Sequence, residues 1–449
     1  MHVDSRGESV SGLRAFIESS PTPYHAALSI SERLEGDGFL RLAEADAFSL
    51  TPAGKYFVRR GGAVVAFRIG EQPASSIGFR VAAAHTDSPT LKLKVGAERR
   101  RHGVVSVPVE VYGGAIVSSW IDRDLGVAGV LATRENGGSG IRFYRSSRPV
   151  AVIPNLAIHL NRSVNEGFEY NKQDHLPAIL QMDDVDSPEQ SGNSRLDPGT
   201  RISESILVRY AASQLGIDPG AVVDADLYLW DMQPPALVGV DESLICSGRL
   251  DNLAACYSAV EAIQSAQSSR TSAVAAFFNN EEIGSRTREG ADSGMLRTIL
   301  ERIVLALGGD REEFHRALAS SFLISNDAAH AVHPNFADKH DPAYSPRLNR
   351  GPVIKYNGNF RYTTTAQTAA YFEDLCRRCD VPVQRFVNRS DMASGSTIGP
   401  AASALSEVPA VDVGIPILGM HSIRETAGVN DPAVMTRVLA QYFAESAIF

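Results

Sequence analysis

The sequence predicts an α/β protein built from both ends of the chain, with a second domain inserted from about residue 94 to about residue 240. Three observations support this. From Arg249 onwards, short apolar runs of buried-strand length alternate with helical patterns. Before residue 90, an apolar run ends in a cluster of polar residues, as two later runs also do. Between these regions, valines alternate with other residues as they do in a half-buried strand.

The elements follow in order along the chain. The first 90 residues suggest helix and then short strands, ending in the apolar run 77–84. Val105, Val107, Val109 and Val111 share one face of a predicted strand. Mixed strand and loop patterns then run to the pair Pro234-Pro235. After that, the runs 273–278 and 321–325 have strand length, and the apolar spacing over 253–263 predicts a helix. We therefore expect a discontinuous domain of residues 1–93 and 241–449, and an insert of residues 94–240.

Composition excludes several classes of protein. Of 449 residues, 43 are Lys or Arg and 52 are Asp or Glu, which gives a formal net charge of −9. This charge argues against nucleic acid as a partner, since such binding needs a basic face. No apolar run reaches the length of a membrane span, and the first twelve residues lack the apolar core of a signal peptide. With four cysteines, too few for a disulfide scaffold, we expect a cytoplasmic protein that does not enter membranes.

Acidic residues and a histidine follow the three apolar runs, at the point where each run ends. His85 and Asp87 follow the first run, Glu281 and Glu282 the second, and Asp327 the third. If the three strands lie parallel in one sheet, their carboxyl ends meet at the same edge, where α/β proteins bind ligands. The sequence therefore predicts that these five side chains converge.

Carboxylates and a neutral imidazole are ligands for divalent metals. Asp87 is well spaced to orient the ring of His85, and of two adjacent glutamates one can bind metal while the other serves as a base. Each signal alone has a simpler explanation: a surface turn for His85 and Asp87, or a solvated strand end for the glutamates.

Other candidates also have simpler explanations. Asp251 could cap a helix, and His421 could be a core histidine. His330 and His333 have the spacing of a ligand pair but are better explained as structural or substrate-lining residues. The motifs HExxH, GxxxxGK[ST], GxSxG and GxGxxG do not occur, so single-zinc peptidases, P-loop NTPases, serine hydrolases and dinucleotide enzymes lack their usual signatures.

Taken in order, these and further segments resemble the aspartyl aminopeptidase family, the M18 group of co-catalytic zinc aminopeptidases. The resemblance extends over nearly the whole chain. It is carried by PTPYHA (21–26), AAHTDSPTLKLK (83–94), SWIDRDLGVAG (119–129), IHLNRSVNEG (158–167), SGRLDNLAAC (247–256), EEIGSRT (281–287), SNDAAHAVHPNFADKH (325–340), LNRGPVIKYNGNFRYTTT (348–365), SGSTIGP (394–400) and GMHSIRETAG (419–428). It implies a metal-dependent exopeptidase-type α/β/α sandwich with an inserted, β-rich dimerisation domain.

The resemblance also implies two divalent metal ions per chain, zinc in the first place and otherwise cobalt or manganese. His85 and Asp327 would hold one ion and Glu282 and His421 the other, with Asp251 bridging both. An anionic bridge offsets the repulsion of two close cations. Glu281 would be the general base, and Asp87 would orient His85.

Two substrate-binding residues are implied in the same way. Lys355 would bind an acidic side chain at the substrate's N-terminal position; without the resemblance, a surface lysine is the better interpretation. His159 would reach the active site of a neighbouring subunit in a homo-oligomer, a tetrahedral dodecamer in this family. The chain departs from the family at Asn279-Asn280, before the glutamate pair, and at Phe360, where glutamine is common.

The sequence thus predicts an aminopeptidase that removes N-terminal residues, preferably Asp or Glu, from peptides. A dinuclear metal amidohydrolase, such as a deacylase or dipeptidase, has the same metal centre and is the alternative among enzymes. A catalytically silent oligomeric shell protein is the alternative from another class, although such a protein would have no need of Glu281 and every ligand.

Overall fold

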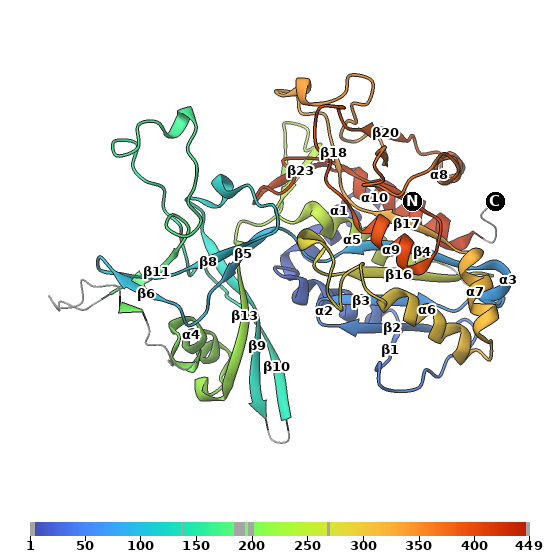
Figure 1. The fold of residues 1–449 in the computed structure, drawn as a ribbon, viewed down its shortest axis with the longest axis horizontal. Helices are drawn as coiled ribbons and strands as arrows, with labels where there is room; N and C mark the ends of the chain where they lie inside the picture. Colours follow the sequence, from blue (N-terminus) through green and yellow to red (C-terminus); the bar gives the residue numbers. More distant parts are fainter. Residues whose placement is uncertain (1–4, 136–137, 184–193, 196–201, 267–269, 446–449) are drawn as a thin grey trace. The chain divides into compact units, whose positions relative to one another are not determined.

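The computed structural model describes residues 5–135, 138–183, 194–195, 202–266 and 270–445. These residues form two compact units (Figure 1). Residues 1–88, 235–420 and 424–449 belong to the first unit, and residues 89–234 with 421–423 belong to the second. The second unit thus begins and ends slightly before the 94–240 limits expected from the sequence, and it includes a short segment near the end of the chain.

A mixed sheet with nine strands among the described residues forms the centre of the first unit. Its order is β1 (Leu40–Arg41), β2 (Lys55–Arg60), β3 (Ala63–Arg68), β16 (Ser272–Phe278), β4 (Phe79–His85), β17 (Phe322–Asn326), β21 (Ala410–Gly414), β19 (Val353–Tyr356) and β20 (Gln384–Val387). The four neighbours β16, β4, β17 and β21 run parallel. The expectation that the three apolar runs lie parallel in one sheet is therefore confirmed.

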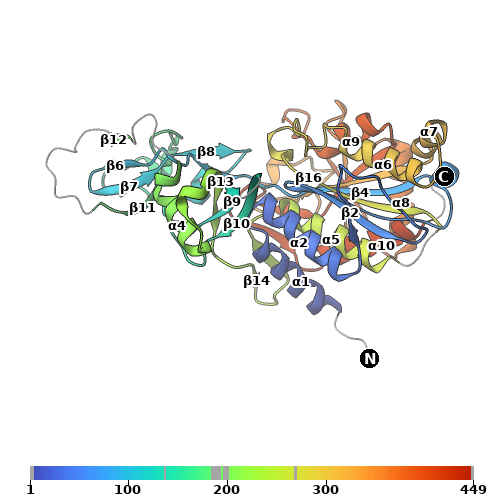
Figure 2. The ribbon, with the colours of Figure 1, turned by 90° about the horizontal axis from the view of Figure 1, so that it is seen from below.

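Helices cover both faces of this sheet (Figure 2). One face packs against α1 (Ser5–Ser19), α2 (Pro23–Gly36), α5 (Leu250–Ser265), α8 (Ala366–Arg378) and α10 (Asp431–Ala444). The other face packs against α3 (Ala74–Ile77), α6 (Met295–Ala306), α7 (Arg311–Ala319) and α9 (Ile398–Ser406). The three layers confirm the predicted α/β/α sandwich.

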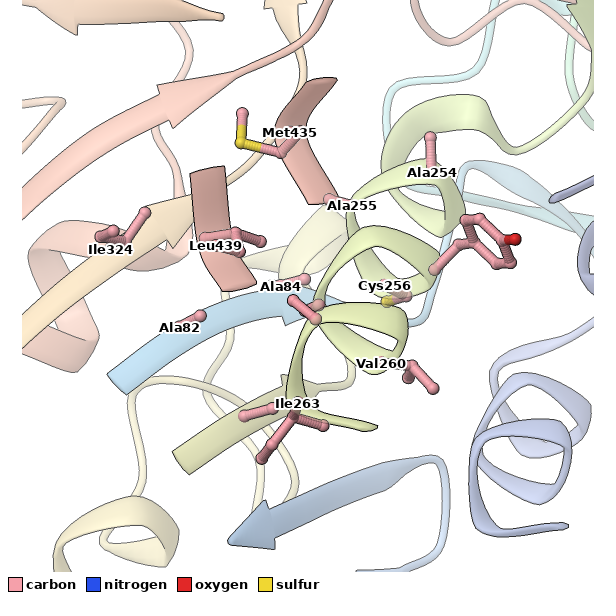
Figure 3. Close-up of a cluster of buried hydrophobic side chains, with 14 of the residues drawn as sticks. Ala82, Ala84, Ala254, Ala255, Cys256, Val260, Ile263, Ile324, Met435 and Leu439 are labelled. Carbon is pink, nitrogen blue, oxygen red and sulfur yellow. The ribbon is translucent and has the colours of Figure 1, made fainter. Parts of the chain in front are cut away.

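Strand β4 shows why the central strands have continuous apolar sequences: its residues are buried on both faces of the sheet. Ala82 and Ala84 enter the core beneath α5 and α10, while Val81 and Ala83 enter the core on the opposite face. Figure 3 shows Ala82 and Ala84 beside Cys256 of α5 and Leu439 of α10. The small residues in β4 let α5 pack close to the strand, and this fixes where the first turn of α5 lies.

A second sheet of the first unit has the order β14 (Ala236–Val238), β15 (Leu244–Ser247), β23 (Glu425–Gly428), β22 (Pro416–Leu418) and β18 (Ala329–His330). It joins the segment that leads into α5 to the segment near the end of the chain, through the antiparallel pairing of β15 with β23. Ser247 lies opposite Glu425 in this pairing.

The second unit is rich in β-structure. One sheet has the order β10 (Gly138–Arg145), β9 (Leu125–Glu135), β13 (Val222–Asp231), β5 (Thr90–Leu93) and β8 (Val109–Tyr112), and another has the order β11 (Ala178–Met182), β7 (Val104–Val107), β6 (Arg99–Arg101) and β12 (Ser194–Arg195). Helix α4 (Ile206–Leu215) packs with them around a separate apolar core.

The single valine strand expected at 105–111 is wrong. Val105 and Val107 belong to β7, whereas Val109 and Val111 belong to β8, which lies in the other sheet. Pro108 stands between them, and because proline has no backbone N–H it interrupts the hydrogen-bonding ladder. The side-chain alternation therefore continues across a change of sheet. In the part of the chain that is described, we find no helix whose length and hydrophobicity suit a membrane span.

Candidate metal centre

The carboxyl ends of three parallel strands bring the predicted side chains to one edge of the large sheet. His85 is the last residue of β4 and lies opposite Phe278, the last residue of β16. The chain leaving β16 forms the single turn Glu281–Ile283, and the chain leaving β17 continues into Asp327. The predicted convergence of these strand ends follows from this register.

His85 is buried and held in one orientation. Its Nδ1 lies 3.0 Å from the backbone oxygen of Asp87 and 3.5 Å from Oδ1 of the same residue. A proton on Nδ1 therefore donates to Asp87, which leaves Nε2 as a lone-pair donor. This Nε2 lies 3.4 Å from Asp251 Oδ1 and 3.6 Å from Asp327 Oδ1. Asp87 thus contacts His85 as the sequence predicts.

The same Asp87 carboxylate holds the glutamate pair. Its two oxygens accept hydrogen bonds from the backbone N–H groups of Glu281 and Glu282, each at 3.1 Å. Asn280 precedes the pair with a φ of 63°, a left-handed conformation that asparagine tolerates better than most residues. One buried carboxylate therefore fixes both the imidazole on β4 and the turn after β16.

Asp251 lies in the first turn of α5, where its φ and ψ of −82° and 104° are not helical. Its side chain faces His85. Single ligand atoms of His85, Asp251 and Glu282 all lie within 4.8 Å of one another. One imidazole nitrogen with carboxylate oxygens is a donor set that suits zinc, so these residues fit a divalent metal.

Burial and mutual repulsion perturb the acids of this group. Burial above all, and then the nearby carboxylates of Asp327, Asp87 and Asp251, raise the pKa of Glu281 to about 8, although His85 opposes this rise. The pKa of Glu282 is also raised well above its usual range, again by burial first and then by Asp251. A divalent cation would stabilise the charged forms of all these acids, which is the electrostatic reason for such a cluster to bind metal.

The pKa of His85 responds in two directions. Burial lowers it, but hydrogen bonds to Asp251, Asp327 and Asp87 outweigh burial and hold it well above its usual range. A metal ligand must be neutral imidazole, so proton release from His85 accompanies metal binding.

His421 contacts backbone atoms of the segment that follows β8. It belongs with the second unit, where its Nδ1 lies 3.2 Å from the backbone oxygen of Gly114 and its own oxygen accepts a hydrogen bond from Ile116 N–H at 3.0 Å. Its φ is 69°. Among the described residues, the group with metal-binding geometry is His85, Asp251 and Glu282, without His421.

Lys355 is buried in β19, so the surface-lysine explanation is wrong. Its Nζ donates to the backbone oxygens of Asp327 and Ala328, at 2.9 and 3.2 Å. Burial lowers its pKa, but Asp327 and Asp412 outweigh that effect and the pKa is raised. The Lys355 ammonium therefore stays charged and contacts the backbone of Asp327, the residue that follows β17.

His159 is exposed in the second unit, between Ile158 and Leu160, which are 46% and 75% exposed.

His330 and His333 line a cavity of about 270 Å³ in the first unit together with His340 and Phe386. His330 and His333 do not belong to the group of His85, Asp251 and Glu282, and their position in the cavity wall agrees with the predicted structural or substrate-lining role.

Sequence reasoning missed residues that act through the backbone of this site. Ser88 Oγ donates to the oxygen of Asp251 at 2.6 Å, and Asp251 N–H donates to Glu425 Oε2 at 2.9 Å. Cys256 Sγ donates to the oxygen of His85 at 3.0 Å. A serine after a strand and a glutamate within one carry no local pattern that predicts these bonds.

Comparison with known proteins agrees with the architecture and with a zinc-binding protein. Residues 16–443 match the family model described as aminopeptidase I zinc metalloprotease (M18). A Pseudomonas savastanoi protein named "Probable M18 family aminopeptidase 2" is 42% identical over 440 residues, which cover 98% of this chain and 99% of that protein.

Solved structures agree as well. Chaetomium thermophilum mApe1 superposes with a TM-score of 0.86 at 30% identity, covering 98% of this chain and 97% of its own. The S. cerevisiae mApe1 dodecamer superposes with a TM-score of 0.80 at 28% identity, covering 99% and 97%.

Proposed function

Since the chain belongs to the M18 family of zinc aminopeptidases, we propose that it removes N-terminal residues, preferably Asp or Glu, from peptides at a centre of two divalent metals. Family membership establishes a metal-dependent aminopeptidase and favours this activity over a deacylase or a silent shell protein. The observation that carries the proposal is the group formed by buried His85 and Asp251 with half-buried Glu282, together with Asp327, whose Oδ1 lies 3.6 Å from His85 Nε2.

We assign His85 and Asp327 to one metal, Glu282 and His421 to the other, and Asp251 to both. Zinc is the ion that the family and the ligands favour, with cobalt or manganese as substitutes. Two such ions, when bound, polarise the scissile carbonyl and lower the pKa of a water. The assignment of His421 rests on its position in the GMHSIRETAG segment.

Glu281 is the general base in this proposal. It takes a proton from the attacking water and returns it to the leaving amine, so one carboxylate serves both halves of the reaction. Its backbone N–H is held by Asp87, which also contacts His85. The base and a metal ligand are thereby positioned by the same side chain.

Lys355 supplies the acidic preference. The chain carries a net charge of −9, so an acidic substrate needs a local cation. An ammonium has three donors, and two N–H groups of Lys355 are engaged by Asp327 and Ala328, so one remains for a substrate carboxylate. Because Phe360 stands where the family commonly has glutamine, we expect a preference for acidic residues rather than an absolute requirement.

We also propose that the protein acts as a homo-oligomer in the cytoplasm. A structurally similar protein, S. cerevisiae mApe1, forms a dodecamer. Around His159, the exposed side chains of Leu156, Ile158 and Leu160 form an apolar surface that a second copy would cover. His159 would then donate to the developing oxyanion in its neighbour's active site. A tetrahedral dodecamer is the arrangement that we expect.

The decisive test is Glu281→Gln in the full chain. Because glutamine cannot take a proton from water, turnover should be abolished while metal content stays near two per chain. Metal analysis of the variant checks the ligands independently of activity. Glu289→Gln is the matched control, since Glu289 lies in the same loop but bonds Asn279 and Gly62. Substantial activity in Glu281→Gln would refute the base assignment.

A further inference from the structure

The backbone of Asp251 is held on both sides of its Cα by side chains from other segments. Its N–H donates to Glu425 Oε2 at 2.9 Å. Its backbone oxygen accepts a hydrogen bond from Ser88 Oγ at 2.6 Å. All three residues are buried. Asp251 therefore has its backbone fixed from two directions while its side chain faces His85.

The two holding residues come from parts of the fold that carry other site residues. Ser88 lies three residues after His85, in the segment that leaves β4. Glu425 is the first residue of β23 and pairs with Ser247 of β15, the strand that precedes α5. The bond to Asp251 thus joins the end of one sheet to the start of α5, and the bond from Ser88 joins that point to the segment of His85.

We propose that Ser88 and Glu425 are positioning residues that aim the carboxylate of Asp251 at the metal centre. This inference rests on the proposed function, in which Asp251 is the ligand shared by both metals. A site of this kind needs its ligands held within about 0.5 Å. The two bonds, one to each peptide group beside the Asp251 Cα, fix the backbone from which the Asp251 side chain extends.

The chemistry of each residue suits its task. The Asp251 oxygen needs a donor, and a serine hydroxyl supplies one without adding charge. The Asp251 N–H needs an acceptor, which glutamate and glutamine both offer. Glu425 therefore acts through the geometry of its bond to the Asp251 N–H.

A purely structural role is the competing explanation, because the bond of Glu425 also joins β23 to α5. That role would lower thermal stability without changing how tightly the folded protein holds zinc. A positioning role changes zinc affinity at the folded protein. The two explanations are separated by measuring both quantities on the same variants.

The experiment uses the full chain and zinc itself as the probe. Zinc affinity is measured by competition with a chromogenic chelator, and the melting temperature is measured with and without zinc, for wild type, Ser88→Ala, Glu425→Ala and Glu425→Gln. Asp431→Asn is the matched control, because Asp431 is also a buried acid that accepts a backbone N–H, from Asn349 at 2.8 Å.

We expect zinc affinity to fall 10- to 100-fold in Ser88→Ala and in Glu425→Ala, the range for residues that orient metal ligands. Glu425→Gln keeps the acceptor and should keep zinc affinity close to that of the wild type. In the alanine variants, kcat should fall with little change in KM. Asp431→Asn should keep wild-type zinc affinity. If Glu425→Ala does not fold, Ser88→Ala still decides.

Wild-type zinc affinity in Ser88→Ala, and in Glu425→Ala where that variant folds, with only a lowered melting temperature, would overturn the positioning role. Asp251→Asn is included to separate this result from failure of the proposed function. If Asp251→Asn loses zinc while Ser88→Ala does not, the positioning role alone is wrong. If Asp251→Asn also keeps wild-type zinc affinity, the ligand assignment is wrong and both proposals fall together.

Discussion

Replacing Asp87 by asparagine tests whether one carboxylate organises the site. In the structure its two oxygens accept the N–H groups of Glu281 and Glu282, each at 3.1 Å. Asparagine keeps one acceptor oxygen but turns an NH₂ group towards the other N–H. A hydrogen bond to a charged group contributes about 1.5–3 kcal/mol, and a buried unsatisfied N–H costs about 1–3 kcal/mol. We expect the free energy of unfolding to fall by about 2–4 kcal/mol.

The assays are thermal unfolding and zinc titration. At about 2 °C per kcal/mol for a large domain, the melting temperature should fall by about 4–8 °C. Because one of the two backbone N–H groups in the Glu281–Glu282 turn is then no longer held, zinc affinity should fall about 10- to 100-fold. Asp292→Asn is the control, since Asp292 lies in the same loop and pairs only loosely with Arg286, at 3.6 Å. Unchanged stability and zinc affinity in Asp87→Asn would refute the organising role.

Three further predictions concern specificity, pH and the core. Lys355→Met should reduce kcat/KM for Asp- and Glu-peptides more than for Ala-peptides, and an equal loss on all of them would remove the specificity role. Burial raises the pKa of Asp431 from 3.8 to about 7, so between these pH values the folded state holds a proton that the unfolded state has lost. The free energy of unfolding should therefore fall by up to about 4 kcal/mol as the pH rises from about 4 to 7. In Asp431→Asn, the melting temperature should depend less on pH over that range. Phe322→Ala removes a ring whose centroid lies 4.7 Å from that of Tyr371. The free energy of unfolding should fall by about 3–5 kcal/mol, which lowers the melting temperature while zinc affinity is retained.

Much of the site could be predicted because the strand ends are local in sequence. Three apolar runs each stop at polar side chains, and the rule that parallel strands share a carboxyl edge brings His85, Glu282 and Asp327 together. Asp251 was ambiguous, since an acid at the start of a helix also caps helices. In the structure, Asp251 Oδ1 lies 3.4 Å from His85 Nε2, and this proximity favours the interpretation as a metal ligand.

The remainder depends on contacts between distant segments. Ser88 and Glu425 act on backbone atoms of Asp251, and backbone atoms leave no side-chain pattern in the sequence. The burial of Lys355 follows from the position of β19 in the sheet and not from its neighbours in the chain. Pro108 shows the opposite case, because the valine alternation predicts one strand and the proline divides it between two sheets.

The most direct test of the account is hydrolysis of Asp-, Glu-, Ala- and Leu-peptide substrates by the purified protein. Each substrate is assayed with a free and with an acylated amine, before and after chelation, and again after zinc or cobalt is restored. We predict cleavage of the free-amine substrates that is fastest for Asp and Glu, is lost on chelation and returns with metal. Cleavage that survives complete metal removal, or that occurs only with acylated substrates, would contradict the account.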